Sequence, residues 1–357
     1  MHSSAPGSGR LPRRVLGGLA LAGVAACGGG SGTGPAVRVT IPPRTTMRVA
    51  ADSLARAGLI RWKRLFRVYA TLRKSDRGIK AGTYLLHRGA SWNSMLDDLR
   101  GGKGLVHVVT IPEGFSLLQI EPLLVAKLGV PRDSMDAAAR DTAVLHALDV
   151  PAPTLEGYLF PDTYIFGDGT TARAAVAVMV RRFEQVWKPE WTARLDTLHL
   201  SRNDVMTLAS IVEKEARVPE ERPVIAAVYL NRLRRGVLLQ ADPTVQFALG
   251  RHAARIYYKD LEVESPYNTY KHKGLPPGPI ASPGRPSIEA ALYPASVPYE
   301  FFVAFPDGHH EFNVDLAGHE RAKLAARKAW DSVDAARRVD SARATAPNAA
   351  ATPRPRP

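Results

Sequence analysis

Two segments of this 357-residue chain share one pattern: a β-branched run, a proline, a Ser or Thr, and an amphipathic run that reaches a glycine. The first covers residues 37–58 and the second covers residues 106–129, with Thr-Ile-Pro at 40–42 and 110–112. Proline interrupts a strand, and a Ser or Thr hydroxyl caps the start of a helix. Each segment is therefore predicted to be a short strand followed by a helix, and the fold class to be α+β.

The chain is long enough for two or three domains with their own cores. We expect a targeting segment and a Gly/Ser linker at residues 1–34, a small α+β module at 35–105 and a mixed α/β domain at 106–325. Residues 326–357 contain the end of a charged helix and an Ala/Pro/Arg-rich tail. We expect this tail to be disordered, because such a composition offers little apolar surface to bury.

The first 34 residues have the composition of an export signal. A basic stretch ending at Arg14 precedes an apolar run from Val15 to Ala26, which is too short for a span of roughly 20 residues. The segment ending in Cys27 resembles a bacterial lipobox, so Cys27 is a candidate lipidation site; a short uncleaved membrane anchor is the alternative. Both alternatives place the remaining chain outside the cytoplasmic membrane.

The formal net charge of +14 is compatible with nucleic acid, an anionic membrane surface or a polyanionic envelope polymer. We expect the excess to be spread along the chain, since no compact Arg/Lys stripe or RNA-binding motif is evident, and the export signal also disfavours nucleic acid. Cys27 is the only cysteine, which excludes an intramolecular disulfide or a cysteine-based metal site. The three histidines His309, His310 and His319 lack a metal-ligand arrangement, and no phosphate-binding loop is present. We expect neither a metal nor a cofactor.

The segment after Ser201 has the pattern of an amphipathic helix that carries two carboxylates near its end. An apolar arc along this helix is flanked on opposite margins by Glu213 and Glu215, whereas Lys214 is expected to point away. A carboxyl group at the rim of an apolar face can be partly desolvated, which raises its pKa and suits it to donate a proton. Periodicity does not choose between the two, and charged residues also flank ordinary surface helices.

Two downstream segments supply hydrogen-bonding and aromatic side chains. Asp242-Pro-Thr244 is typical of a turn, in which Asp and Thr bond to backbone groups, although both could also contact a ligand. The segment Tyr267-Asn268-Thr269-Tyr270 is denser in side chains that bind sugars than a connecting loop requires. Aromatic faces stack on pyranose rings, and amide groups bind N-acetyl substituents. A polar polymer such as a glycan is therefore a plausible substrate.

The chain resembles the YceG-like family of endolytic murein transglycosylases. Eight segments match in the family's order over roughly residues 37–325, and together they are very specific. They are Ile111-Pro-Glu-Gly114, Leu155-Glu-Gly-Tyr-Leu-Phe-Pro-Asp-Thr-Tyr164, Ala209-Ser-Ile-Val-Glu-Lys-Glu215, Asn231-Arg-Leu233, Asp242-Pro-Thr244, Tyr267-Asn-Thr-Tyr270, Gly274-Leu-Pro-Pro-Gly278 and Phe312-Asn313.

The resemblance implies a LysM-like module at 35–105, a catalytic domain at 106–325 and lyase activity on peptidoglycan at the MurNAc–GlcNAc β-1,4 bond. It assigns the chemistry to the first Glu of the Val-Glu-Lys-Glu run, Glu213, with Glu215, Glu156 and Tyr164 in supporting positions. The candidate substrate-binding residues are Asn231, Asp242, Thr244, Tyr267, Asn268, Thr269, Tyr270 and Asn313. Family members typically have a membrane-spanning helix near the N-terminus, whereas this chain has the shorter run that ends at Cys27.

The expected reaction needs one carboxyl group. It protonates the glycosidic oxygen and then accepts the proton of the C6 hydroxyl, which closes on C1 to give a 1,6-anhydro end. A lysozyme-like hydrolase would ordinarily need a second carboxylate, for which Asp242 and Glu156 are candidates. A glycan-binding envelope scaffold without activity is a further alternative. The expected partners are peptidoglycan strands, the cell membrane through the N-terminus, and possible cell-wall synthases, with the catalytic domain on the extracytoplasmic side.

Overall fold

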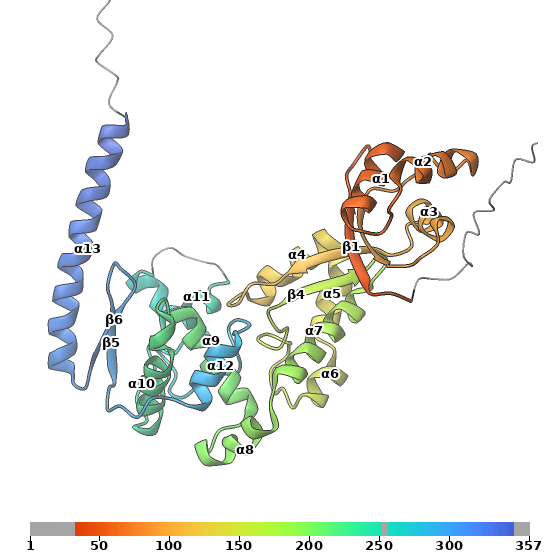
Figure 1. Cartoon of the computed structure of the whole chain (residues 1–357). Helices are drawn as coiled ribbons and strands as arrows, with labels where there is room; N and C mark the ends of the chain where they lie inside the picture. The colour runs from red at the N-terminus through yellow and green to blue at the C-terminus, as the bar shows by residue number, and fades with distance from the viewer. Residues whose placement is uncertain (1–32, 251–255, 346–357) are drawn as a thin grey trace, which may run out of the picture. The chain divides into compact units, whose positions relative to one another are not determined.

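A computed structural model of the chain describes residues 33–250 and 256–345. The chain divides into two compact units, the first ending at Gly104 and the second beginning at Leu105 (Figure 1). Both units combine helices with antiparallel strands, so the predicted α+β class is confirmed. Cys27 and the tail beyond residue 345 lie outside the described residues.

Within residues 33–104, the first unit contains one pair of antiparallel strands and three helices. Strand β1 (Ala36–Ile41) pairs with β2 (Gly82–His87) in a register that sets Ala36 opposite His87. The helices are α1 (Met47–Arg56), α2 (Lys63–Leu72) and α3 (Trp92–Gly101). Leu54, Phe66 and Tyr84 are fully buried between them. The strand–helix interpretation of residues 37–58 is confirmed by β1 and α1, whereas the LysM-like assignment stays a prediction.

The second unit begins with the second predicted strand–helix segment. Strand β3 (Leu105–Thr110) pairs antiparallel with β4 (Thr163–Gly167), and the turn after Pro112 leads into α4 (Leu117–Leu128). Ser116 and Gln119 form a capping box at the start of α4. Three further helices pack in this part of the unit: α5 (Arg132–Ala139), α6 (Thr142–Ala147) and α7 (Ala172–Val186).

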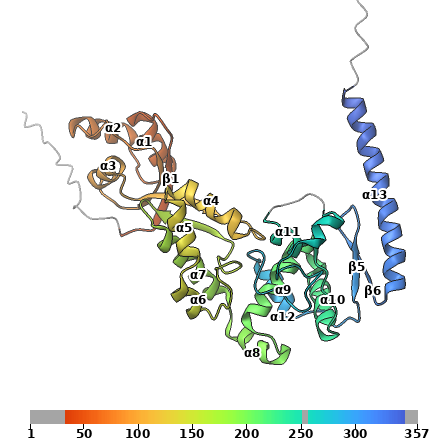
Figure 2. The same cartoon turned by 180° about the vertical axis from the view of Figure 1, so that it is seen from behind.

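The remainder of the second unit is built around one buried helix, α9 (Arg202–Glu215). Around it lie α8 (Pro189–Leu198), α10 (Arg222–Arg234), α11 (Asp242–Ala248) and α12 (Arg285–Leu292), with short 3-10 turns at Pro219–Glu221 and Tyr258–Glu262. Strands β5 (Phe301–Ala304) and β6 (His310–Asn313) form a hairpin, and α13 (Leu316–Thr345) packs beside it in both views (Figures 1 and 2).

Helix α9 is buried on every side rather than along one apolar arc, so the predicted amphipathic pattern is wrong for this helix. The helix begins after Ser201, as the sequence predicted, and Ser201 and Asp204 form a capping box there. Its polar residues bind the Gly/Pro-rich loop 274–284. The Asn203 Nδ2 donates to the Pro277 carbonyl at 3.1 Å, and the Ile280 N–H donates to Ser210 Oγ at 3.0 Å. Buried polar side chains on this helix are therefore satisfied by the loop.

Within the described ranges, no helix combines the length and the apolar character needed to cross a bilayer. Helix α13 begins at Leu316 and continues to Thr345, so it includes Ala344 and Thr345, the first two residues of the Ala/Pro/Arg-rich tail that was expected to be disordered.

Candidate active site

Three consecutive residues at the end of α9 reach three different surroundings. Glu213 contacts the start of α12, Lys214 contacts the backbone of Gly114, and Glu215 contacts Tyr229 on α10. This divergence follows from the helix, in which successive side chains are about 100° apart. The two carboxyl groups of the Glu-Lys-Glu run therefore face separate environments.

The carboxylate of Glu213 is engaged by the first turn of α12. Its Oε2 accepts hydrogen bonds from the Gly284 N–H at 3.1 Å and from Ser287 Oγ at 2.6 Å. Arg222 Nε in turn donates to Ser287 Oγ at 3.1 Å. Glu113 lies nearby, and burial together with the negative charge of Glu213 raises its pKa. Glu213 thus joins α9 to the N-terminus of α12, where a negative charge is favoured by the helix dipole.

A side chain at Gly284 would displace the carboxyl group of Glu113, because a Cβ atom placed on Gly284 would overlap that group. A glycine here allows Glu113 and Glu213 to approach the same turn of backbone. The predicted Gly/Pro-rich loop is therefore a packing element against α9, in addition to any contact it makes with a ligand.

Glu215 opens onto a cavity of about 600 Å³. Burial raises its pKa to about 7, an effect that the hydrogen bond from Tyr229 Oη at 3.0 Å reduces and the negative charge of Asp242 increases. A carboxyl group with this pKa is protonated about half of the time at neutral pH. It can therefore donate a proton to a bound substrate.

Polar and aromatic groups surround Glu215 in this cavity. Tyr270 Oη donates to Asp242 Oδ1 at 2.5 Å, and burial together with Asp242 raises the pKa of this phenol. Arg232 Nη2 donates to Gln240 Oε1 at 2.5 Å. The lining also includes Tyr229, Leu239, Glu300, Phe301, Phe302, His310 and His319. Carboxyl, amide and aromatic groups converging on one cavity are typical of a binding site for a polar substrate.

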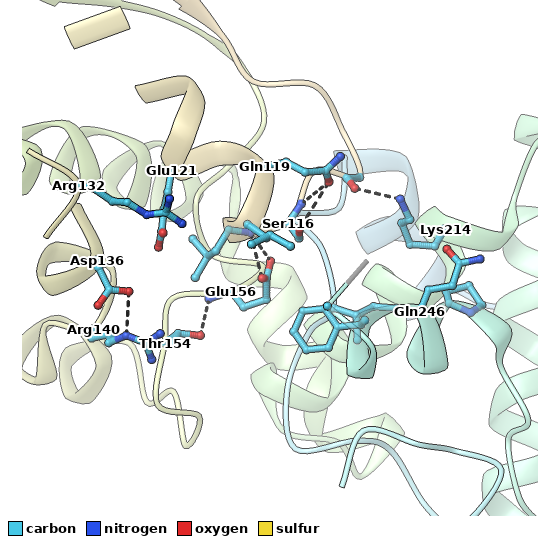
Figure 3. Close-up of a pocket in the computed structure, with 17 residues that line it drawn as sticks. Ser116, Gln119, Glu121, Arg132, Asp136, Arg140, Thr154, Glu156, Lys214 and Gln246 are labelled. Atoms are coloured by element: carbon cyan, nitrogen blue, oxygen red, sulfur yellow. Dashed lines mark hydrogen bonds and ion pairs between the residues drawn. The ribbon is translucent and has the colours of Figure 1, made fainter. Parts of the chain in front are cut away.

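The sequence predicted that Lys214 points away from the protein, and this prediction is wrong. It is half-buried, and its Nζ donates to the Gly114 carbonyl at 3.3 Å (Figure 3). Burial lowers its pKa, whereas the charge of Glu213 opposes this shift. Lys214 lines a second cavity, of about 430 Å³, together with Glu156, Gln246 and Phe247.

Glu156 has a buried carboxyl group that contacts the start of α4. The Leu117 N–H donates to both of its oxygens, at 3.2 and 3.0 Å, and burial raises its pKa to about 8 in spite of these bonds. It lines the cavity beside Lys214 and is absent from the described lining of the cavity at Glu215. Of the two candidates for a second carboxylate, only Asp242 shares the cavity with Glu215.

Three of the candidate substrate-binding residues are fully buried and bond within the protein, so their contact with substrate stays a prediction. Thr244 and Thr269 bond to each other through their hydroxyl groups at 2.9 Å, and the Ala241 N–H donates to Thr269 Oγ1 at 3.0 Å. Asn268 Nδ2 donates to the carbonyls of Leu261 and Val263 at 2.8 and 2.9 Å. These side chains fix the loop that presents Tyr270 and the helix start that presents Asp242.

The predicted turn at Asp242-Pro-Thr244 is the first turn of α11, which corrects the turn assignment. Proline is well tolerated at the first positions of a helix because its missing N–H would have no intrahelical partner there. Asp242 is consequently held on a helix that contacts α9. This placement gives the Asp242 carboxylate a fixed position beside Glu215.

The remaining candidates have structural contacts. Asn231 Nδ2 donates to the carbonyls of Val297 and Tyr299, both at 2.9 Å, and Tyr267 packs on Phe247 with ring centroids 4.7 Å apart. Tyr164 is buried on β4, and its hydroxyl donates to the Phe160 carbonyl. Asn313 ends β6, with a buried Nδ2 that has no hydrogen-bond partner among the described residues. Only Asp242 and Tyr270, of the eight, line the cavity at Glu215.

The histidines do not assemble into a metal site. His310 Nδ1 pairs with Glu221 Oε2 at 2.6 Å, His309 Nδ1 with Asp307 Oδ1 at 2.5 Å, and His319 stacks on Phe301. Over residues 33–250 and 256–345, no group of three His, Cys, Asp or Glu residues could coordinate an ion.

Three residues of the site, Tyr229, Arg232 and Ser287, were not predicted from the sequence. Tyr229 reaches Glu215 from a neighbouring helix, 14 positions further along the chain, and Ser287 reaches Glu213 across 74 positions. No local pattern encodes such pairs, because they depend on how α10 and α12 pack against α9. Arg232 belongs to the motif Asn231-Arg-Leu233, in which Asn231 is the predicted substrate-binding residue.

The fold and the site define a family. The sequence profile of the YceG-like family matches residues 39–325, and the chain belongs to this family. It is similar to the endolytic murein transglycosylase of Bacillus subtilis, with 33% identity over 302 residues that cover 80% of this chain and 84% of that protein.

Two further similarities agree with the family assignment. The endolytic murein transglycosylase of Streptococcus pneumoniae serotype 2 is 29% identical over 327 residues, which cover 81% of this chain and 59% of that longer protein. A crystal structure of a YceG-like protein from Listeria monocytogenes has a TM-score of 0.60 and 32% identity, covering 80% of this chain and 98% of that one.

Proposed function

We propose that this chain is an endolytic peptidoglycan lytic transglycosylase, a lyase that cleaves the MurNAc–GlcNAc β-1,4 bond within glycan strands. The observation that carries this proposal is Glu215, a carboxyl group with a pKa of about 7 in a cavity of polar and aromatic side chains. Two relatives that cover four fifths of the chain are named endolytic murein transglycosylases, which supports the choice of substrate and reaction.

Glu215, rather than Glu213, is the general acid in this proposal. The resemblance assigns the chemistry to Glu213, but one oxygen of that carboxylate, Oε2, accepts hydrogen bonds from Gly284 and Ser287. Glu215 combines a raised pKa with access to the larger cavity and with two of the candidate substrate-binding residues, Asp242 and Tyr270. Glu213 then acts as a positioning residue that fixes α12 and loop 274–284 against α9.

In the first step, protonated Glu215 transfers its proton to the glycosidic oxygen, the bond between that oxygen and C1 of MurNAc breaks, and the GlcNAc side leaves with a hydroxyl group while positive charge develops at C1. In the second step, the Glu215 carboxylate accepts the proton of the C6 hydroxyl of the same sugar. The C6 oxygen bonds to C1, and a 1,6-anhydro end results. One carboxyl group thus serves as acid and then as base, as raised pKa values allow near neutral pH.

A hydrolase is the second candidate function, and Asp242 is the observation that favours it. Asp242 lies in the same cavity as Glu215, and its charge contributes to the raised pKa of Glu215. A second carboxylate could activate water and give a reducing end instead of an anhydro end. The hydrogen bond from Tyr270 to Asp242 Oδ1 occupies one of its oxygens, which reduces its capacity to act as a base.

The arrangement along the chain is also part of the proposal. Residues 35–105 form a LysM-like module and residues 106–325 the catalytic domain, on the extracytoplasmic side of the cell membrane. Attachment is through a lipid on Cys27 or through an uncleaved anchor. Cell-wall synthases that produce the nascent strands are the proposed protein partners, and no nucleic acid is bound.

The test is mass spectrometry of the products released from purified sacculi by the full chain. Anhydro-MurNAc ends that disappear with Glu215→Gln and persist with Glu213→Gln are expected. The reverse pattern would return the acid role to Glu213 while preserving the reaction. Reducing ends would establish a hydrolase, and binding of sacculi without cleavage by the wild-type chain would identify a glycan-binding scaffold.

A further inference from the structure

The positive charge of the chain is concentrated in its first unit. Residues 33–104 contain 15 Lys and Arg residues against four Asp residues, a formal charge of +11, whereas residues 105–357 contain 30 residues of each sign. The expectation that the excess is spread along the chain is therefore wrong. A compact module with this charge attracts a polyanionic surface.

Helix α2 exposes an apolar face beside this charge. Leu65, Val68 and Leu72 are 56, 58 and 78% exposed, and Trp62, directly before the helix, is 57% exposed. With a step of about 100° per residue, these side chains gather on one side, whereas Phe66 and Ala70 face the core. The exposed side chains, here termed the α2 ridge (Trp62, Leu65, Val68, Leu72), form a contiguous stripe rather than isolated surface residues.

A basic groove of about 900 Å³ adjoins the α2 ridge. Arg48, Arg64, Arg67 and Arg77 line it together with Val68 and Leu72. In the part of the chain that the structure describes, neither Arg64 nor Arg67 forms an ion pair, so both guanidinium groups can bind a ligand. Guanidinium groups bind phosphate oxygens in a bidentate manner.

We propose that the α2 ridge and the basic groove bind an anionic lipid bilayer. The ridge side chains enter the boundary between headgroups and acyl chains, and the arginines bind lipid phosphates. A helix with an apolar stripe flanked by basic residues binds membranes in this way, through buried apolar area and attraction to anionic lipids. The first unit is then a membrane-binding module, independently of any anchor or lipid at the N-terminus.

The chemistry of the groove favours a bilayer over two other occupants. None of the described residues that line the groove is aromatic, whereas a groove for uncharged sugar rings would be expected to offer aromatic faces for stacking. Two copies of this unit would bring +11 against +11, which opposes dimerisation through this face. An anionic bilayer supplies both the negative charge and the apolar layer that the face lacks.

The experiment places an environment-sensitive fluorophore at position 72 of the full chain, through Leu72→Cys in a Cys27→Ser background. The labelled chain is reconstituted in phosphatidylglycerol-containing vesicles and in purely zwitterionic vesicles. Lipids with a spin label on the acyl chain then quench the fluorophore if it enters the bilayer. Thr40→Cys, an exposed position on β1, serves as the labelling control.

Quenching at position 72 is expected in the anionic vesicles, with little at position 40, and it should fall in high salt. Arg64→Glu with Arg67→Glu should weaken this response at least ~10-fold, since each basic residue contributes appreciably to attraction by an anionic surface. Arg38→Glu with Lys103→Glu, which changes the net charge equally outside the groove, should retain more of it.

Three outcomes would overturn the proposal. The first is a fluorophore at position 72 that stays unquenched in anionic vesicles. The second is a response to purified sacculi without lipid, which would assign the face to glycan. The third is an equal loss of quenching in both double variants, which would show that net charge alone, rather than this groove, determines binding.

Discussion

The two sides of α9 differ although their carboxyl groups are only two residues apart. On one side, Glu213 accepts two hydrogen bonds from the start of α12 and joins two helices. On the other, Glu215 meets a phenol, a second carboxylate and a cavity of about 600 Å³, and its pKa rises to about 7. Residue type therefore does not define an acid catalyst; the groups supplied by neighbouring helices do.

The largest expected effect is on activity. Glu215→Gln removes the transferable proton while preserving the size of the side chain, and should lower kcat on sacculi by about 10³-fold. The unfolding midpoint should be retained or increased, because an amide avoids burying a charge. Activity within about twofold of wild type would contradict the role of Glu215.

The next effect separates a structural carboxyl group, Glu156, from the proposed general acid, Glu215. Glu156 has a folded-state pKa of about 8, above the ordinary value of 4.5, so the folded protein binds more protons than the unfolded chain between these values. Its contribution to stability is fully present below about pH 4.5 and is lost as the pH rises through 8. Glu156→Gln should remove a decline on the order of 4 kcal/mol between pH 5 and pH 8.

Denaturant titrations across this pH range measure the decline. Glu215 has a folded pKa raised in the same direction, to about 7, so a shallower slope should remain in the Glu156→Gln protein. An unchanged slope in that variant would show that Glu156 is not protonated in the folded state.

Glu213→Gln should affect stability more than chemistry. The amide can accept the hydrogen bonds from Gly284 and Ser287 but loses its charge at the start of α12, which should cost about 1–2 kcal/mol of unfolding free energy. We expect kcat to fall only severalfold. A loss of activity as large as that of Glu215→Gln, with stability retained, would reverse the comparison between the two carboxyl groups.

The smallest effect concerns the pH profile. Tyr229 donates to Glu215 at 3.0 Å and lowers its pKa, so Tyr229→Phe should raise that pKa and shift the alkaline limb of kcat to higher pH by less than about one unit. Tyr158→Phe, which also loses a buried hydroxyl but contacts Asn203, is the matched control. A shift to lower pH would contradict the assigned hydrogen bond.

The structural features that could be predicted from the sequence are those that depend on residues close together in the chain. The start of α9 after Ser201 and the strand–proline–helix order of both segments follow from local patterns. The α+β class could be predicted because alternation and helical periodicity are local properties as well.

The surroundings of each carboxyl group could not be predicted. Thr244 and Asn268 have the chemistry of sugar-binding residues, yet their polar atoms are consumed by internal hydrogen bonds. Tyr229 acquires its importance only when α10 packs against α9. Burial and long-range pairing decide these roles, and a single sequence does not encode either in a local pattern.

Loop 274–284 has no regular secondary structure over most of its length, but Asn203, Ser210 and Glu213 of α9 bind it at three points. The backbone amides of Ile280 and Gly284 should consequently exchange their protons for deuterium as slowly as amides within a helix. Loop 274–284 therefore does not act as a hinge. If a glycan strand has to pass this loop, another part of the protein must move to admit it.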